Sequence, residues 1–227
     1  MKVYLELTDI TLMEQAANTE RDGLLIRLLS RLGCRIPELL ALRGRDIDFE
    51  QGTITILHLK RRFNVSCPDC RSRLSIRHQY CSVCGKKIDD TTKGQQERKR
   101  IRVLPIDQRS IDMLKQYLSR NKLYVDNNQL LFSISRHRAW QIVRDCATKA
   151  GLPCLINPET GRTRGVSPHR LRDAFSVHAM KLNDTGDGLR LLQEHLGHAS
   201  FNTTAKYRKI AGTEHREWYD HLWNDCA

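Results

Sequence analysis

Apolar residues recur at helical spacing through most of the chain. The clearest case is a stripe of leucines three and four residues apart, which indicates a helix with one buried face. Thr19 and the acids after it have the pattern of an N-cap and first turn, and Gly33 is expected to end the helix. The stripe consists of Leu24, Leu25, Leu28, Leu29 and Leu32.

The same criteria predict further helices along the chain. Pro37 suits the first turn of a short helix, and Ser167 followed by Pro168 has the N-cap and first-position pattern of a longer one. The segment 152–166 contains prolines and glycines and is expected to be a loop. Helices are expected at Asp9–Ala17, after Pro37, at Ser110–Leu118, Ala139–Ala150, Pro168–Leu182 and Gly186–Leu196, around Tyr207, and at Thr213–Asn224.

Two segments have the period-two pattern of strands. Thr53–Leu59 alternates β-branched and apolar residues after a turn at Gly52, and Arg100–Leu104 ends at Pro105. The residues between them are polar, basic and rich in cysteine, which favours an insertion at the tip of a hairpin, where added length costs little entropy. The expected fold class is therefore mainly α-helical (α+β) with a small antiparallel sheet.

The positive charge is concentrated in this insertion. The whole chain has a formal net charge of +12, and residues 60–102 hold thirteen basic and four acidic residues, a net of +9. A basic balance of this size usually indicates a polyanionic partner. No apolar run approaches the roughly 18 residues that cross a bilayer, and the first residues lack a signal-peptide pattern. We expect a cytoplasmic protein without a membrane partner.

Four of the eight cysteines have the spacing of a metal site. Two CxxC pairs stand ten residues apart, and four thiolates so arranged can close a tetrahedral structural zinc site. An iron–sulfur cluster and a redox dithiol pair remain as alternatives, and His78 could replace one ligand. The predicted ligands of one zinc ion are Cys67, Cys70, Cys81 and Cys84; the other cysteines are expected to be single thiols.

Several motifs in order along the chain resemble the tyrosine recombinases of the phage integrase family. These are GCRIPELLALRGRDIDF around Arg35, Lys60 at a strand end, SPHRLRDAF from Ser167, and LLQEHLGHASFNTTAKY ending at Tyr207. The resemblance covers nearly the whole chain apart from the cysteine-rich insertion. It implies a recombinase catalytic domain that breaks and rejoins double-stranded DNA through a 3′-phosphotyrosine, without ATP or a catalytic metal.

The resemblance implies a role for each matching residue. Arg35 and Arg172 match the two arginines that hold the phosphate, and guanidinium groups can contact its oxygens bidentately. His169 matches the histidine that manages the proton of the nucleophile. His198 matches a hydrogen-bond donor to the phosphate, and Tyr207 matches the nucleophile. His195, one turn before His198, is expected to be exposed.

Two further matches are less specific. Lys60 corresponds to the hairpin lysine that protonates the leaving 5′-oxygen, although Arg61 and Arg62 leave a one-residue ambiguity and the usual flanking glycines are missing. Glu38 matches an acidic position that orients catalytic groups. It is equally suited to stabilise the first helical turn.

The insertion departs from the family pattern. We expect residues 1–64 and 97–227 to form the catalytic domain and residues 65–96 to form a zinc ribbon. The ribbon is expected to contact DNA; the alternatives are a contact with another protein and a purely structural role. No N-terminal core-binding domain is expected in this chain, and truncation and a naturally minimal protein both remain open. The expected DNA-contacting residues are Arg61, Arg62, Arg71, Arg73, Arg77, Lys86 and Lys87.

The sequence leaves the biological setting open. Integration or excision of a mobile element is the preferred setting, with chromosome or plasmid dimer resolution second. A catalytically silent DNA-binding regulator and a zinc-ribbon RNA-binding protein are the alternatives from other functional classes. We also expect self-association on DNA, through either cis or trans docking of the C-terminal helix Thr213–Asn224, and association with the nucleoid.

Overall fold

A computed structural model describes the chain at residues 2–57, 64–75, 78–89, 101–123, 128–157, 160–183, 185–198 and 200–210. Five of the predicted features, Lys60, Arg61, Arg62, Arg77 and the helix Thr213–Asn224, lie outside the described residues.

The chain begins with three helices, of which the second lies at the centre of the fold. They are α1 (Leu7–Gln15), α2 (Glu20–Leu32) and α3 (Ile36–Leu40). Thr19 accepts a hydrogen bond from the backbone of Asp22, and Gly33 ends α2 in the left-handed conformation, as predicted. Helix α1 begins two residues earlier than expected, because the backbone of Glu6 donates to the carboxylate of Asp9 in a capping box.

A small antiparallel sheet lies beside α3, with the strand order β1-β2-β5. The strands are β1 (Ile47–Asp48), β2 (Thr53–Leu57) and β5 (Ile101–Pro105), and the register pairs Ile54 with Leu104. Both of these side chains are buried. The predicted hairpin is thus confirmed.

The C-terminal part of the described chain is mainly helical. Helices α5 (Gln108–Arg120) and α6 (Arg136–Lys149) begin earlier than expected, because Asp107 and Ser135 serve as N-caps. They are followed by α7 (Pro168–Leu182), α8 (Gly186–Leu196) and α9 (Phe201–Ile210). Among the described helices, none combines the length and apolarity that a bilayer crossing requires.

The segment 152–166 was wrongly expected to be only a loop. It contains an antiparallel pair of two-residue strands, β6 (Leu155–Ile156) and β7 (Thr163–Arg164). The backbone of Asn157 donates to the carbonyl of Arg162 at 2.9 Å and extends the pairing of the two strands by one residue. Strands this short carry too few residues for an alternating pattern to be visible in the sequence.

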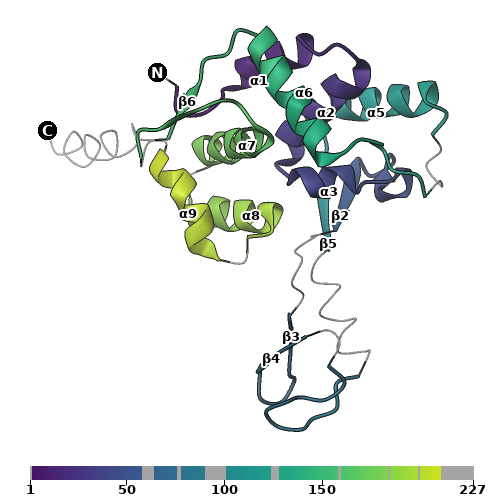
Figure 1. The fold of residues 1–227 in the computed structure, drawn as a ribbon, viewed down its shortest axis with the longest axis vertical. Helices are drawn as coiled ribbons and strands as arrows, with labels where there is room; N and C mark the ends of the chain where they lie inside the picture. Colours follow the sequence, from purple (N-terminus) through teal and green to yellow (C-terminus); the bar gives the residue numbers. More distant parts are fainter. Residues whose placement is uncertain are drawn as a thin grey trace, which may run out of the picture.

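The helical body has two apolar clusters. The larger one is built around α2, which packs against α1, α5, α6 and α7. The smaller one joins α7, α8 and α9 and includes Val177, Leu192 and Tyr207. Figure 1 shows α7, α8 and α9 gathered on one side of the body. The fold is therefore mainly helical with a small antiparallel sheet, as the sequence predicted.

The cysteine-rich insertion has its own small core. Strands β3 (Asn64–Ser66) and β4 (Arg73–Ser75) pair antiparallel, and Leu74 and Ile88 pack with two of the cysteines. Figure 1 shows this unit beyond the ends of β2 and β5, apart from the helical body. We call residues 64–75 and 78–89 the cysteine module.

Candidate functional site

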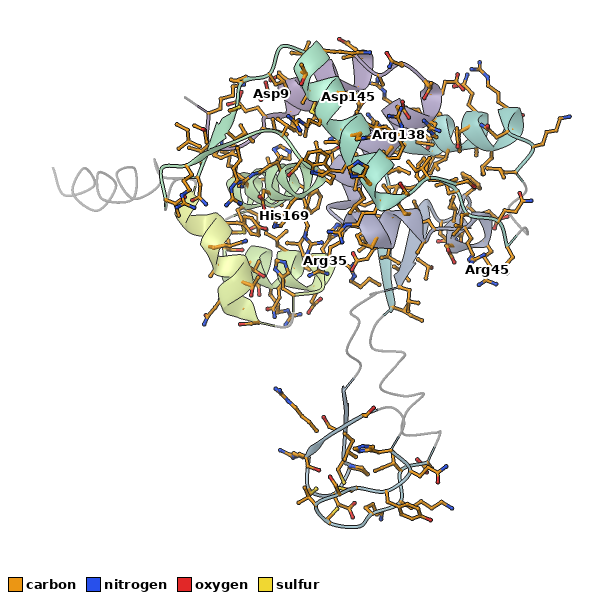
Figure 2. The ribbon with its side chains drawn as sticks, viewed as in Figure 1. Asp9, Arg35, Arg45, Arg138, Asp145 and His169 are labelled. Carbon is orange, nitrogen blue, oxygen red and sulfur yellow. The ribbon has the colours of Figure 1, made fainter. Side chains whose placement is uncertain are left out.

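Three of the predicted catalytic residues line one pocket of about 510 Å³ between α3, α6 and α7. Arg35 comes from the start of α3, and His169 and Arg172 come from the first turn of α7. Trp140 of α6 completes the wall. Figure 2 shows Arg35 and His169 near the centre of the body. We call this cavity the arginine pocket.

Arg35 is held by a buried carboxylate. Its Nη1 donates to Oε1 of Glu38 at 3.1 Å, and its backbone nitrogen donates to Oε2 at 3.0 Å. Burial opposes ionisation of Glu38, but the backbone hydrogen bond from Arg35 and the charges of Arg102 and Arg35 leave its pKa lowered. Glu38 therefore caps α3 and pairs with Arg35 at the same time.

Arg102 is a site residue that the sequence reasoning missed. From β5 it donates to Oε2 of Glu38 at 2.9 Å and to the backbone carbonyl of His195. Its neighbours Ile101 and Val103 are exposed, so the inward face of β5 carries Arg102 and Leu104. The sequence did contain an indication of this role, because Arg102 alternates with Leu104 on one face of the predicted strand. The apolar residues Ile101 and Val103 made the opposite face look like the buried one.

Arg172 is buried behind the arginine pocket. It donates to the carbonyls of Gly33 at 2.7 Å and Leu196 at 2.8 Å, and its Nη2 lies 3.0 Å from Nε2 of His198. Desolvation and the nearby Arg35 lower its pKa to about 10, so the guanidinium remains charged at neutral pH. These contacts fix the side chain with little freedom.

His198 uses both ring nitrogens within the protein. Nε2 accepts from Arg172, and Nδ1 lies 2.8 Å from the hydroxyl of Thr204, so the ring is neutral with its proton on Nδ1. Burial and the charge of Arg172 lower the pKa of His198 to about 4. The predicted donation to a phosphate therefore requires the ring to leave one of these partners.

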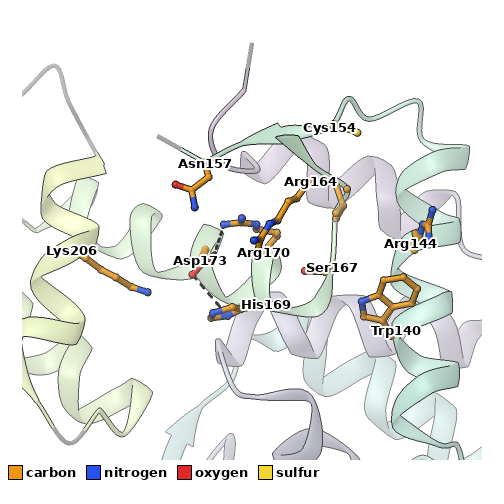
Figure 3. Close-up of a pocket in the computed structure, with 12 residues that line it drawn as sticks. Trp140, Arg144, Cys154, Asn157, Arg164, Ser167, His169, Arg170, Asp173 and Lys206 are labelled. Atoms are coloured by element: carbon orange, nitrogen blue, oxygen red, sulfur yellow. Dashed lines mark hydrogen bonds and ion pairs between the residues drawn. The ribbon is translucent and has the colours of Figure 1, made fainter. Parts of the chain in front are cut away.

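His169 faces the cavities. Its side chain is 68% exposed, and Nδ1 lies 4.0 Å from Oδ1 of Asp173 (Figure 3). Partial desolvation lowers the pKa of His169. The negative charge of Asp173 acts in the opposite direction, and the positive charges of Lys206 and Arg172 lower the pKa further. It lines the arginine pocket and also a second cavity of about 660 Å³, which we call the basic pocket.

Tyr207 lies inside the α7–α8–α9 cluster. The residue is 1% exposed, and its hydroxyl donates to Oδ1 of Asp173 at 2.8 Å. Its ring stacks on that of His198, with centroids 6.4 Å apart and planes at 14°. Burial and the charge of Asp173 raise the pKa of Tyr207. The structure thus places Tyr207 beside His198, while its hydroxyl points to a carboxylate.

His195 was wrongly expected to be exposed. Its side chain is partly buried, and Nε2 lies 3.0 Å from the carbonyl oxygen of Leu32. The ring also stacks on Phe175, with centroids 4.6 Å apart. The end of α8 packs against the C-terminus of α2, a contact that helical periodicity alone does not reveal.

The four cysteines of the two CxxC pairs converge in the cysteine module. Their Sγ atoms all lie within 4.8 Å of one another, and Cys67–Cys84 and Cys70–Cys81 are each 3.5 Å apart. Zinc–sulfur bonds of about 2.3 Å in a tetrahedron place sulfur atoms roughly 3.8 Å apart, so this donor set fits a zinc ion. Within the described residues, His78 is not part of the cluster.

Two similar turns build the cluster. The residue after each second cysteine, Arg71 or Gly85, has a positive φ, of 59° and 73° respectively. Their backbone nitrogens donate back to the carbonyls of Cys67 and Cys81. The backbone of Val83 also donates to the sulfur of Cys81, as expected for turns that direct amides toward thiolates.

The predicted DNA-contacting residues within the described chain lie on the surface of the module. Arg71, Arg73, Lys86 and Lys87 are all exposed. Lys86 lies 3.6 Å from the carboxylate of Asp69, and both side chains are about half exposed. These positions are compatible with contact to a polyanion.

Comparison with known proteins identifies the family. The family model described as "Phage integrase family" matches residues 4–214. The chain belongs to the phage integrase family. The matched range contains all of the predicted catalytic positions and the cysteine module.

Curated relatives of this phage integrase chain include tyrosine recombinases. It is 28% identical over 206 residues to tyrosine recombinase XerA of Pyrococcus furiosus, covering 87% of this chain and 53% of the relative. It is 28% identical over 191 residues to XerD of Neisseria meningitidis serogroup B, covering 84% and 51%. The chain therefore spans about half the length of the curated relatives it matches.

Solved structures of recombinases share the fold. The crystal structure of XerA recombinase aligns with a TM-score of 0.64 at 22% identity, over 98% of this chain and 66% of that chain. XerH bound to palindromic difH substrate aligns with a TM-score of 0.63 at 21% identity, covering 96% and 52%. The catalytic domain of bacteriophage HP1 integrase aligns with a TM-score of 0.53 at 16% identity, covering 99% and 96%. The described fold is that of a recombinase catalytic domain.

Proposed function

We propose that this phage integrase chain catalyses site-specific DNA strand exchange, with Tyr207 as the nucleophile. The observation that carries the proposal is the convergence of Arg35, His169 and Arg172 on one pocket, with Arg172 connected through His198 to the ring of Tyr207. The family and the named relatives support recombination as the general activity.

The residues suit each step of the proposed reaction. Arg35 and Arg172 stabilise the charge of a pentavalent phosphate in the arginine pocket. The oxygen of Tyr207 attacks phosphorus, His169 accepts the phenolic proton, and the departing 5′-oxygen takes a proton from Lys60. The result is a 3′-phosphotyrosine and a free 5′-hydroxyl. Attack by a 5′-hydroxyl reverses these steps and rejoins the strand, so no ATP or catalytic metal is required.

The proposed setting is integration or excision of a mobile element, with chromosome or plasmid dimer resolution as the second setting. The Tn1549 transposon integrase in complex with transposon right end DNA shares this fold, at a TM-score of 0.58 and 14% identity over 99% of this chain, so the fold is compatible with the first setting. The Xer relatives leave the second open. A cytoplasmic, nucleoid-associated location accompanies either setting.

The module is proposed to be a zinc ribbon, residues 65–96, within a catalytic domain formed by 1–64 and 97–227. One zinc ion held by the four thiolates would cross-link the module, because its small apolar core does not bury enough surface to stabilise the fold without the metal.

The exposed cations of the module would contact DNA. Module deletion should weaken binding in gel shifts and reduce the salt slope, whereas unchanged affinity and slope would remove the DNA-contact role.

Self-association on DNA is proposed to involve the helix Thr213–Asn224, docked on a neighbouring copy. Analytical ultracentrifugation with and without a duplex target, for the full chain and for a chain ending at residue 212, tests this. Loss of DNA-dependent assembly in the shortened chain supports trans docking. Unchanged assembly supports docking on the same chain.

The decisive experiment is a suicide-substrate assay in EDTA. Nicked duplexes from candidate attachment sites are incubated with the full chain, and a covalent protein–DNA adduct is sought on a denaturing gel. The adduct should form with the wild type and with Tyr117→Phe, a buried control in α5, and should be absent with Tyr207→Phe.

The alternative function is a DNA-binding regulator without catalysis. The burial of Tyr207 and the commitment of its hydroxyl to Asp173 favour this alternative. DNA binding in gel shifts without any adduct, on the native site and with a supplied core-binding domain, would overturn the recombinase proposal in its favour.

A further inference from the structure

The contact between Tyr207 and Asp173 joins two buried groups. The phenolic hydroxyl of Tyr207 donates to Oδ1 of Asp173 at 2.8 Å, and their residues are 1% and 9% exposed. Tyr207 lies in α9, whereas Asp173 directly follows Arg172 in α7. One carboxylate therefore connects the nucleophile's helix to the helix that supplies His169 and Arg172.

The carboxylate is itself fixed in place. Nη1 of Arg170 donates to Oδ2 of Asp173 at 3.1 Å, and Nδ1 of His169 lies 4.0 Å from Oδ1, as Figure 3 shows. A charged acceptor with one oxygen on a guanidinium and the other on a phenol has little freedom to turn away. The acceptor of Tyr207 is thus held by the same helical turn that lines the arginine pocket.

The tyrosine is separated from both cavities. Asp173 lines the basic pocket, and His169 lines both pockets, but Tyr207 is not among the lining residues of either one. Because Tyr207 is 1% exposed and its hydroxyl is bonded to Asp173, a DNA phosphate at the surface does not reach the phenolic oxygen in this arrangement. Tyr207 has to leave Asp173 before it can attack.

The chemistry of the contact favours a protonated and unreactive tyrosine. The carboxylate of Asp173 can accept a hydrogen bond from Tyr207 only while the phenol is protonated, and its negative charge opposes formation of the phenolate. In agreement, burial and Asp173 raise the pKa of Tyr207. Lys206, whose Nζ lies 4.8 Å from the centre of the Tyr207 ring, stands over the ring face and not at the hydroxyl.

We propose that Asp173 is a latch: it holds the hydroxyl of Tyr207 in a protected position, and its release precedes DNA cleavage. The proposal rests on the assignment of Tyr207 as nucleophile under the proposed function. Asp173 is assigned as a positioning residue, because it acts through its contact with the tyrosine in the resting state.

The first test measures the tyrosine without DNA. Nitration by tetranitromethane, followed by peptide mass spectrometry, reports each tyrosine separately because the reagent attacks phenolates. Tyr80, which is 58% exposed, serves as the reactive reference, and Tyr117, which is 8% exposed, as the protected one. In the wild type Tyr207 should react like Tyr117. Asp173→Asn should raise its reaction rate about tenfold, which corresponds to one pKa unit.

The second test measures cleavage. Asp173→Asn should form the covalent adduct on the suicide duplex faster than the wild type, again by about tenfold. Asp187→Asn is the matched control, because Asp187 is an exposed acid at the start of α8 that lines neither pocket. A gain in rate is not an effect of damage to the fold, so it separates a latch from a structural role.

The two tests distinguish failure of the latch from failure of the proposed function. Slower cleavage by Asp173→Asn with unchanged DNA binding, or unchanged nitration of Tyr207, would overturn the latch. Absence of adduct in every protein together with increased nitration would overturn the nucleophile assignment and leave the contact itself supported. If Asp173→Asn does not fold, Asp173→Ser, which is smaller and uncharged, should also raise nitration of Tyr207; an unchanged rate would overturn the latch.

Discussion

Arg102 of β5 and Glu38 of α3 form a buried ion pair at 2.9 Å. The other oxygen of Glu38 accepts a hydrogen bond from Arg35. Arg102 on β5 therefore helps to hold Arg35 in the arginine pocket, because both arginines bind the same carboxylate. The side chain of Glu38 is 2% exposed, and these cations replace water around its charge.

Removal of Arg102 should therefore destabilise the protein strongly. We expect Arg102→Leu to lower the free energy of unfolding by about 3 kcal/mol in urea denaturation, because a buried carboxylate loses one of its cations. Adduct formation should also slow, since Arg35 loses the fixed position of its partner. Arg109→Leu is the control: Arg109 is 64% exposed and pairs with Glu14 at 3.8 Å, so its loss should cost less than about 1 kcal/mol. Equal effects of the two variants would contradict this account.

Gly33 should tolerate no side chain. Its φ is +54°, and a Cβ there would lie 2.5 Å from Cδ1 of Phe175. Since its carbonyl also accepts from Arg172, we expect Gly33→Ala to cost roughly 2 kcal/mol of stability and to reduce adduct formation. Gly23→Ala in α2 is the matched control, because its Cβ meets nothing closer than 3.6 Å and alanine should stabilise the helix by up to about 1 kcal/mol. Thermal unfolding of both variants measures the difference.

Stability should fall in acid because His198 is neutral in the folded protein. Its folded pKa is about 4, below the unfolded value of about 6.5, so the unfolded chain binds more protons between these values. Stability then rises with pH from about 4 to about 6.5 and is unaffected by this group above that range. Thermal unfolding across pH 4–7 should show a steeper dependence for the wild type than for His198→Gln. Identical slopes would show that His198 does not contribute.

Metal removal should unfold the module and spare the helical body. The module core of Cys67, Leu74, Cys81 and Ile88 is separate from the two clusters of the body. Cys84→Ser should abolish binding of one zinc equivalent, measured by mass spectrometry of metal content, while the helical circular dichroism persists. Absorbance near 400 nm in the purified protein would instead indicate an iron–sulfur cluster. Cooperative loss of all helical signal with the metal would contradict independent folding.

Local sequence determined most of the helices and the cysteine cluster. Thr19 and Gly33 bound α2 because capping and left-handed backbone are properties of one or two residues. The CxxC pairs predicted a thiolate cluster because their spacing alone brings the sulfurs of each pair together. The order of the motifs was sufficient to predict the recombinase fold, and the family match confirms it.

Tertiary structure alone decided how the site residues are held. Arg102 reaches Glu38 only because the β2–β5 register turns it inward, and His195 is partly buried only because α8 ends against α2. The contact of Tyr207 with Asp173 depends on the packing of α9 on α7. Periodicity reports which face of an element is buried, but the partner on that face comes from a distant part of the chain, and packing selects it.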